Sequence, residues 1–596
     1  MYNASYPLST VGAEIYSFGG FNQKNGNAAG FYRLPAAANN NTALYPNGFL
    51  PEINTDIRDV SFVLGVKGQI KGWNVDLSNN FGKNNLDYRV ANSLNASLGA
   101  GSQTAFNCGG FSYTQNIMNF DASKLFKFFE RTSIAFGGEY RNENYKIFAG
   151  EEASYRNYGL KEQVVIDTLT TKDAAGKVTK TPYFSNKTVD ILGKAGGAQV
   201  FPGFRPENVT DQSRNASSVY IDAETDFTKN FMVATALRFE NYSDFGQTLN
   251  YKIASRLKIG KMFSIRGATS TGFRAPSQQQ KYFTATSTLF QDGVPFEVGT
   301  FPNNSRAAQL LGIPTLKQET NLNYSLGFTA RPMENLEITL DAYQIDIKNR
   351  IILTGQFGNA TDPLLDQTQK DRQKVISGEL AAANVQRAAF FTNAVDTRTR
   401  GVDMVVSYNL KFTNTHYIKF VAAGNLAQNK VKTSADGRAS LNITDKLRGL
   451  EPVFFNREDQ SRLEVANPRG KANLTIQYVN NRFNIMVRNA YWDRVVYLHP
   501  EDGDATRWVV NATTGARETR DQIFKPRLIT DLTVGFQVTK SLNLSIGANN
   551  LLDIYPDKHK HFTNYDYGRF AYSRRVTQFG FNGAYYFARL RFNLKS

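Results

Sequence analysis

The sequence predicts an all-β fold, a transmembrane antiparallel β-barrel, from three observations. Apolar and polar residues alternate with a period of two along the whole chain, the connections between the alternating segments are sorted by length, and no long apolar run occurs. Segments 219–224, 336–342 and 532–538 each place aliphatic or aromatic side chains on one face and charged, polar or small ones on the other. Such alternation is typical of strands with one apolar and one polar face.

Nineteen strands of this kind can be traced along the chain, and short and long connections alternate between them. Nine connections are tight turns, at Ser9–Gly12, Gly68–Gly72, Lys127–Arg131, Thr228–Asn230, Gly260–Met262, Arg331–Asn335, Lys411–Asn414, Asn480–Arg482 and Thr539–Ser541. The other nine lie near 21–57, 90–112, 151–214, 243–247, 274–318, 351–388, 432–465, 496–527 and 553–573, and only the one near 243–247 is short.

The length sorting separates a membrane barrel from a soluble β-sandwich, which has no reason to collect its long loops at one end. Outer-membrane barrels have short periplasmic turns and long extracellular loops, and their tilted strands need about ten residues to cross the apolar band. Lipid offers no partner for an unpaired backbone amide, so the strands must pair side by side. Tyr and Phe cluster near strand ends, where interfacial aromatic girdles lie.

Composition excludes several classes of protein. The 596 residues contain no linker or compositional break, so we expect one architecture from residue 1 to 596. A mean hydropathy of −0.41 without an apolar run near 18 residues excludes membrane-spanning helices. The single cysteine, Cys108, excludes a disulfide framework and Cys-based metal sites. The net charge of +17 comes from interspersed residues rather than a basic stripe, so it indicates a solvated surface or attraction to anionic lipids or ligands, not to nucleic acid.

The sequence contains no catalytic or metal-binding constellation. Walker A, GxSxG and HExxH segments do not occur, and we expect neither an enzyme nor a cofactor. His559 and His561 form an HxH pair in a basic loop, but no third ligand is indicated. The segment Glu501–Thr506 resembles the start of a calcium loop and lacks its downstream carboxylate.

Specific segments resemble the barrel of TonB-dependent outer-membrane receptors. The most characteristic are "TGFRAPS" (Thr271–Ser277) and "LNLSIGANNLLDIYPD" (Leu542–Asp557), and the similarity runs essentially from residue 1 to 596. The resemblance implies a 22-stranded barrel in the cell outer membrane, filled by an N-terminal plug and energised by the TonB–ExbB–ExbD complex through a TonB box.

The resemblance also bears on how the chain begins. "YNASYPL" (Tyr2–Leu8) is similar to the family's fourth strand. We therefore expect 19 strands of 22, without signal peptide, TonB box, plug or first strands. Nineteen strands in an up-and-down order place the first and last in the same direction. We expect a gap between them that leaves two strand edges and makes insertion inefficient.

Candidate ligand-binding residues lie in two long loops that offer hydrogen bonds and flat stacking faces at the barrel mouth. The first group follows the strand that ends in "TGF", and the second flanks the loop near 496–527. They are Arg274, Gln278, Gln279, Gln280 and Tyr282, and Trp492, Arg494, Tyr497, Arg507 and Trp508.

The resemblance implies a receptor for TonB-dependent uptake of a scarce, large solute. A ferric siderophore or another iron complex is the favoured ligand, with outer-membrane lipid or lipopolysaccharide as surroundings. A passive porin, an oligosaccharide or cobalamin receptor of the same family, and an adhesive surface barrel are the alternatives.

Overall fold

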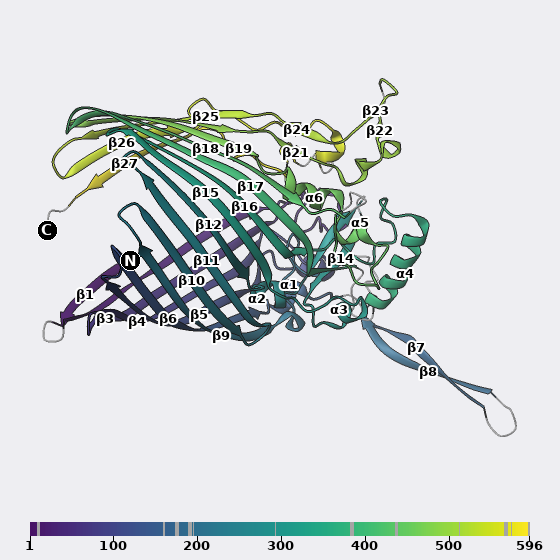
Figure 1. Ribbon diagram of the computed structural model, residues 1–596. Coiled ribbons are helices and arrows are strands. Elements are labelled where there is room, and N and C mark those ends of the chain that lie inside the picture. The colour runs from purple at the N-terminus through teal and green to yellow at the C-terminus, as the bar shows by residue number, and fades with distance from the viewer. Residues whose placement is uncertain are drawn as a thin grey trace.

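The structure is a computed structural model of the chain. It describes residues 1–8, 12–158, 161–172, 178–188, 194, 196–291, 294–381, 387–434, 439–511, 513–565, 570–573 and 575–593. Its strands form a curved wall, and the long loops and helices gather at one end of that wall (Figure 1).

Nineteen strands follow one another in an antiparallel ladder, as the sequence predicts. Each pairs with the next barrel strand along the chain. They are β1 (Tyr2–Leu8), β2 (Ala13–Ala29), β3 (Glu52–Ile70), β4 (Trp73–Ala91), β5 (Phe106–Phe126), β6 (Arg131–Phe148), β9 (Thr210–Asp226), β10 (Phe231–Tyr242), β11 (Gly246–Ile259), β12 (Phe263–Arg274), β15 (Glu319–Met333), β16 (Leu336–Leu353), β17 (Arg387–Thr413), β18 (His416–Val431), β19 (Gly470–Asn480), β20 (Phe483–Trp492), β25 (Arg527–Gln537), β26 (Leu542–Asn549) and β27 (Tyr585–Phe592).

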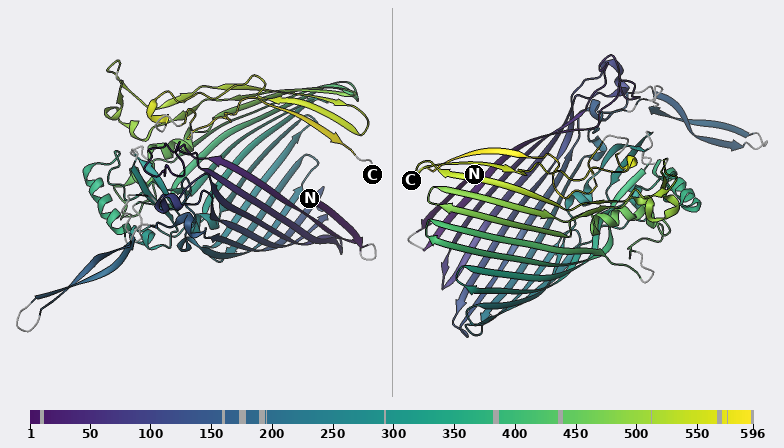
Figure 2. Two further views of the ribbon diagram at one scale, coloured as in Figure 1. Left: turned by 180° about the vertical axis from the view of Figure 1, so that it is seen from behind. Right: turned by 90° about the horizontal axis from the view of Figure 1, so that it is seen from above.

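The short connections fall where the alternation places them, and they lie at the end of the wall opposite the helices (Figures 1 and 2). Of the predicted turn at Ser9–Gly12, residues 9–11 lie outside the described residues. The predicted boundaries of the long loops were wrong in several places. β2 continues to Ala29, and β17 is 27 residues long. The strands continue well past the length that crosses an apolar band. Strand pairing satisfies backbone amides outside the membrane as well as within it, so the ladder need not end at the membrane boundary.

The two faces of the wall differ as the alternation predicts. Across β9 and β10, Val219 and Ile221 face Phe239 and Leu237, and all four side chains are exposed. On the other face polar groups bond across strands: the Tyr220 hydroxyl donates to Asp121 (2.5 Å), and Arg266 donates to both carboxylate oxygens of Asp341 (2.7 and 2.5 Å). One surface therefore suits lipid and the other an aqueous interior. None of the described helices is both long and apolar enough to cross a membrane.

Further strands lie within the long loops. They are β7 (Lys161–Lys172) and β8 (Val178–Thr188), β13 (Ala285–Gln291) and β14 (Val294–Phe301), β21 (Val495–Tyr497) and β24 (Gln522–Phe524), and β22 (Val509–Val510) and β23 (Arg517–Glu518). β7 and β8 form a ribbon that projects away from the wall (Figure 2). β14 pairs in parallel with the first residues of β17 and thus ties its loop to the barrel.

Short helices complete the loop end. They are α1 (Glu152–Tyr155), α2 (Gln278–Tyr282), α3 (Arg306–Leu310), α4 (Gln367–Ala381), α5 (Glu451–Phe454) and α6 (Arg457–Glu464), with 3₁₀ turns η1 (Ala96–Gly101), η2 (Pro206–Asn208), η3 (Pro500–Gly503), η4 (Ala505–Arg507) and η5 (Phe562–Tyr565).

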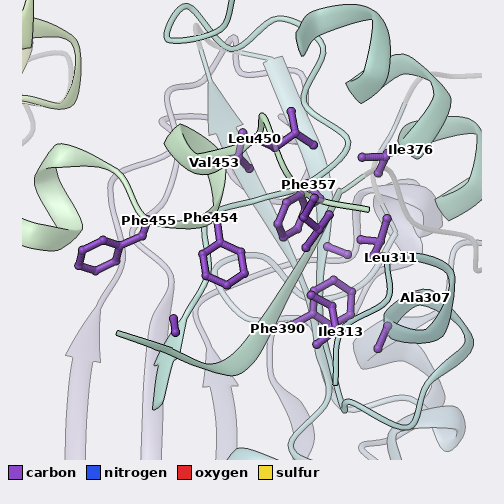
Figure 3. Close-up of a cluster of buried hydrophobic side chains, with 14 of the residues drawn as sticks. Ala307, Leu311, Ile313, Phe357, Ile376, Phe390, Leu450, Val453, Phe454 and Phe455 are labelled. Atoms are coloured by element: carbon purple, nitrogen blue, oxygen red, sulfur yellow. The ribbon is translucent and has the colours of Figure 1, made fainter. Parts of the chain in front are cut away.

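The largest hydrophobic core lies among the loops, not inside the barrel. We call it the cap core. It joins the loops 275–318, 354–386 and 432–469 to the start of β17, and Figure 3 shows Phe357, Phe390 and Leu311 pointing toward one another within it. Its buried members are Ala307, Ala308, Leu311, Ile313, Phe357, Leu365, Ile376, Leu380, Ala388, Phe390, Ala394, Val395, Val431, Leu447, Leu450, Val453, Phe454 and Phe455. Three long loops thus fold together as one body.

We predict that Ile376→Ala loosens the cap core while Val375→Ala on the same helix does not. Ile376 is 7% exposed and Val375 is 65% exposed. Truncating the buried side chain should cost about 2–5 kcal/mol, and truncating the exposed one at most about 0.5 kcal/mol. Hydrogen exchange of amides in α4 and at the start of β17 measures the difference, and equal exchange in the two variants would contradict the packing described here.

Candidate ligand-binding site at the loop end

The "TGFRAPS" segment acts as a clamp between strands. Arg274 ends β12 and donates from Nε and Nη2 to the carboxylate of Glu319 at the start of β15, at 2.9 and 2.5 Å. The same carboxylate accepts the backbone N–H of Ile351 in β16 at 2.7 Å. Glu319 is buried, and the paired guanidinium satisfies its charge. Arg274 therefore fixes the tops of three strands.

A second clamp joins the same segment to the inner wall. Arg214 on β9 donates to the backbone carbonyl of Pro276 at 2.7 Å and, through Nε, to Glu143 on β6 at 2.6 Å. The Tyr113 hydroxyl donates to Glu143 at 2.5 Å. Arg214 and Glu143 have side chains only 5% exposed, so the pair is a buried salt bridge whose hydrogen bonds are filled from several elements.

The rest of the first predicted group forms α2, the helix that follows the clamp. Ser277 and Gln280 cap it reciprocally, with each side chain accepting the other residue's backbone N–H. Gln278 is 1% exposed and faces inward. Tyr282 packs against the buried cluster of Tyr145, Ile147 and Phe204. In this group the side chain of Gln279 faces solvent, and that of Arg274 is also exposed although it pairs with Glu319.

The second predicted group is divided between packing and exposed positions. Trp492 ends β20 and carries the Lys471 ammonium 3.8 Å from its ring centre. Tyr497 is buried with Ala466, Val495, Phe524 and Val576 in a small cluster between loops. Within the second loop, the Trp508 indole donates to the carbonyl of Asp502 at 3.1 Å. We expect these aromatic side chains to shape the loop.

Two arginines of the second group remain at the surface. Arg494 is exposed, and Arg507 is exposed while donating to the carbonyl of Pro363 at 3.0 Å in a neighbouring loop. No hydrogen bond or ring contact between described residues joins the first predicted group to the second. The structure thus leaves Arg274, Gln279, Arg494 and Arg507 accessible to a ligand, and their role remains a prediction.

Ion pairs hold the loop of the second group to its neighbours. Arg457 of α6 donates to both oxygens of Asp521 (2.7 and 2.6 Å), and Arg520 donates from Nε and Nη2 to Asp502 (2.8 and 2.5 Å). Burial raises the pKa of Asp502, but the Arg520 hydrogen bonds outweigh burial and leave the pKa below its usual range. These partners were missed from the sequence, because 64 residues separate Arg457 from Asp521 and only the loop path brings them together.

Two histidines of this region pack among loop side chains. Burial lowers the pKa of His499, and the Arg520 cation lowers it further. Burial also lowers the pKa of His559, whose ring lies 5.9 Å from Phe524 and 6.1 Å from Tyr497. His561 instead contacts the Thr563 hydroxyl (2.8 Å). Within the described residues, no three His, Cys, Asp or Glu side chains form a group that could hold a metal ion.

These features define a class of protein: a membrane β-barrel whose long loops fold into a cap. A family model described as TonB dependent receptor-like, beta-barrel matches residues 2–551. The chain therefore belongs to the TonB-dependent receptor β-barrel family, whose members are transporters of the outer membrane rather than enzymes.

Individual relatives are distant. The chain is 23% identical to the ferric enterobactin receptor PirA of Pseudomonas aeruginosa over 165 residues, which is 27% of this chain and 21% of that receptor. The crystal structure of the siderophore receptor PirA from Acinetobacter baumannii aligns over 99% of this chain and 76% of its own, with 13% identity and a TM-score of 0.55. The ferric-catecholate import receptor Fiu from E. coli aligns over 99% and 73%, with 11% identity and a TM-score of 0.53. These structures establish the fold alone.

We predict that Arg214→Met destabilises the barrel top, because it leaves the Glu143 carboxylate buried without a cation. The expected loss is about 3–5 kcal/mol, and adding Glu143→Gln should restore part of it. The urea midpoint of unfolding, followed by gel mobility and tryptophan fluorescence, measures both changes. A double variant as unstable as the single one would show that the buried charge is not the cause.

We predict that acidification loosens the junction of β21 and β24. The folded-state pKa of both His499 and His559 is lowered, so the unfolded loop binds protons first, and stability is lost as pH falls from about 7 to 5. The contribution of Asp502, whose pKa is also lowered, persists until pH drops below the ordinary aspartate range. Hydrogen exchange at Val495–Tyr497, corrected for intrinsic rates, should show several-fold less protection at pH 5. His499→Gln combined with His559→Gln should flatten that profile.

Proposed function

We propose that this chain forms the barrel of a receptor that imports an iron complex across the outer membrane, energised by TonB–ExbB–ExbD. The family match over residues 2–551 carries this proposal, and the iron ligand is suggested by the relative named a ferric enterobactin receptor. In this scheme the loops capture the solute outside the cell, and the polar inner face of the wall borders the path that it follows.

The loop end supports ligand capture in two ways. The cap core gives three loops a fixed shape, so a ligand would meet a preformed surface and lose less ordering free energy on binding. Exposed Arg494 and Arg507 offer planar, permanently charged guanidinium groups, which suit the anionic oxygens of an iron chelate. Gln279 adds an exposed amide, and the net charge of +17 favours the approach of anions.

We expect a strain that lacks the gene to lose uptake of at least one ferric siderophore under iron limitation, and the gene supplied on a plasmid to restore it. Uptake of radiolabelled iron as catecholate and hydroxamate complexes, with labelled cobalamin and maltooligosaccharide in parallel, identifies the solute class. A TonB-deficient strain should lose the same uptake. Uptake that is independent of TonB and proportional to concentration would favour a porin instead.

Variants of the exposed residues locate the ligand contact. Arg494→Ala and Arg507→Ala together should weaken ferric siderophore binding by about tenfold or more, since each removes a charge-assisted contact. Arg448→Ala is a matched control, because Arg448 is an exposed loop arginine that pairs with Asp445 at the surface (2.7 Å). Unchanged binding in the double variant would place the ligand elsewhere on the cap.

A further inference from the structure

The short turns at the end of the barrel opposite the cap carry a repeated cation. Six of the nine turns place one Lys or Arg within the few residues between paired strands, and every one of these side chains is exposed. We call this set the turn cations: Lys71, Lys127, Lys229, Lys261, Arg482 and Lys540.

The turn cations form no ion pair with an acidic side chain among the described residues, whereas several cations at both ends of the barrel do. At the cap, Arg457, Arg520 and Arg575 each pair with a carboxylate. At the turn end itself, Arg131 pairs with Asp226 and Arg331 pairs with Glu337, so acidic partners can be accommodated there. The turn segments contain two exposed acids, Glu130 and Glu334, against six cations. The turn end thus holds uncompensated positive charge.

Each turn cation has an exposed apolar residue within two positions along the chain. Lys71 follows Ile70, Lys127 precedes Phe128, and Arg482 precedes Phe483. These apolar neighbours are 40–63% exposed, and the full set is Ile70, Phe128, Phe227, Met262, Phe483 and Val538. Phe227 and Val538 each lie two residues before their cation, Lys229 and Lys540, and the other four are adjacent to theirs. Ring contacts link neighbouring hairpins, with Phe129 4.7 Å from Phe227 and Phe483 4.8 Å from Phe536.

This combination of groups has a specific chemistry. Aromatic side chains prefer the level of lipid head groups, and Lys or Arg near that level attract anionic lipids over a distance set by salt screening. The cations are spread from β3 to β26 along the rim, one to a hairpin, rather than gathered in one patch as for a protein partner. The apolar neighbours would be costly to expose to water but are stable against acyl chains.

We propose that the turn cations form a ring that binds the head groups of anionic phospholipids in the membrane leaflet facing the periplasm. The inference rests on the membrane-spanning barrel of the family and not on which solute is carried. The phosphodiester oxygens of the lipid would accept hydrogen bonds from the ammonium and guanidinium groups, while the neighbouring apolar side chains lie along the first methylenes of the acyl chains.

The chain contains a natural fluorescent reporter at the short-turn end of the barrel. Of its three tryptophans, only Trp73 lies at the turn end, immediately after Lys71 and Gly72. Its ring lies 5.3 Å from Phe136. Trp73 shares a face with the exposed Leu77, which is the lipid-facing side. In a Trp492→Phe, Trp508→Phe variant, quenching of fluorescence by lipids with brominated chains therefore reports the lipids beside Lys71.

Quenching of Trp73 by brominated phosphatidylglycerol in phosphatidylcholine bilayers gives the ratio of the binding constants of the two lipids beside Lys71. We expect this ratio to favour phosphatidylglycerol by at least about threefold. Replacing all six turn cations by Gln should bring that ratio close to one, as should about 0.5 M salt. The matched control replaces six exposed cap cations by Gln and should leave the ratio unchanged. These are Lys317, Lys430, Arg469, Lys525, Lys558 and Lys560.

A second measurement tests the proposal without the tryptophan variant, in case that variant inserts poorly into bilayers. The chain with all tryptophans in place, purified in mild detergent, should retain phosphatidylglycerol in preference to phosphatidylcholine when its bound lipids are quantified by mass spectrometry. The six-fold turn variant should lose that preference. Equal preference in the turn variant and the unaltered chain would overturn the proposal, and so would a ratio near one in both.

Discussion

One constraint determines the architecture of this protein: backbone N–H and C=O groups must form hydrogen bonds with each other where water is absent. A lipid-facing strand can satisfy its amides and carbonyls only through neighbouring strands. Nineteen strands therefore pair in chain order, and the alternation of their side chains follows from the pleat. Outside the membrane the constraint lapses, and the same chain forms helices, short ribbons and the cap core.

The barrel could be predicted from sequence, because its rules are local. A period of two fixes which side chains share a face, and turn residues such as Gly72 and Gly260 adopt positive φ at tight reversals. Strand ends were predicted less well, since β2 and β17 continue into segments with no apolar requirement. The alternation signal stops at the membrane boundary, but the ladder does not.

The residues that pair between loops could not be predicted, because their contacts depend on the three-dimensional course of each loop and not on a repeating sequence pattern. Arg214 meets Glu143 across 71 residues only once the strand register is set. The sequence could not distinguish Gln278 from Gln279, because a short helix buries one side chain and exposes its neighbour. The overall charge was equally ambiguous in the sequence, and only the strand pairing shows that six of its cations lie in the short turns at one end of the barrel.

The continuity of β17 links the two ends of the molecule. Its first residues, including Ala388 and Phe390, are buried in the cap core, and its last residues reach the short-turn end at Phe412. A displacement of the three fused loops would therefore pull on a strand that crosses the whole bilayer. The cap core and the short-turn end are thus joined by one continuous strand, and a substitution in any of the three loops that changes the core would also change the packing at the start of that strand.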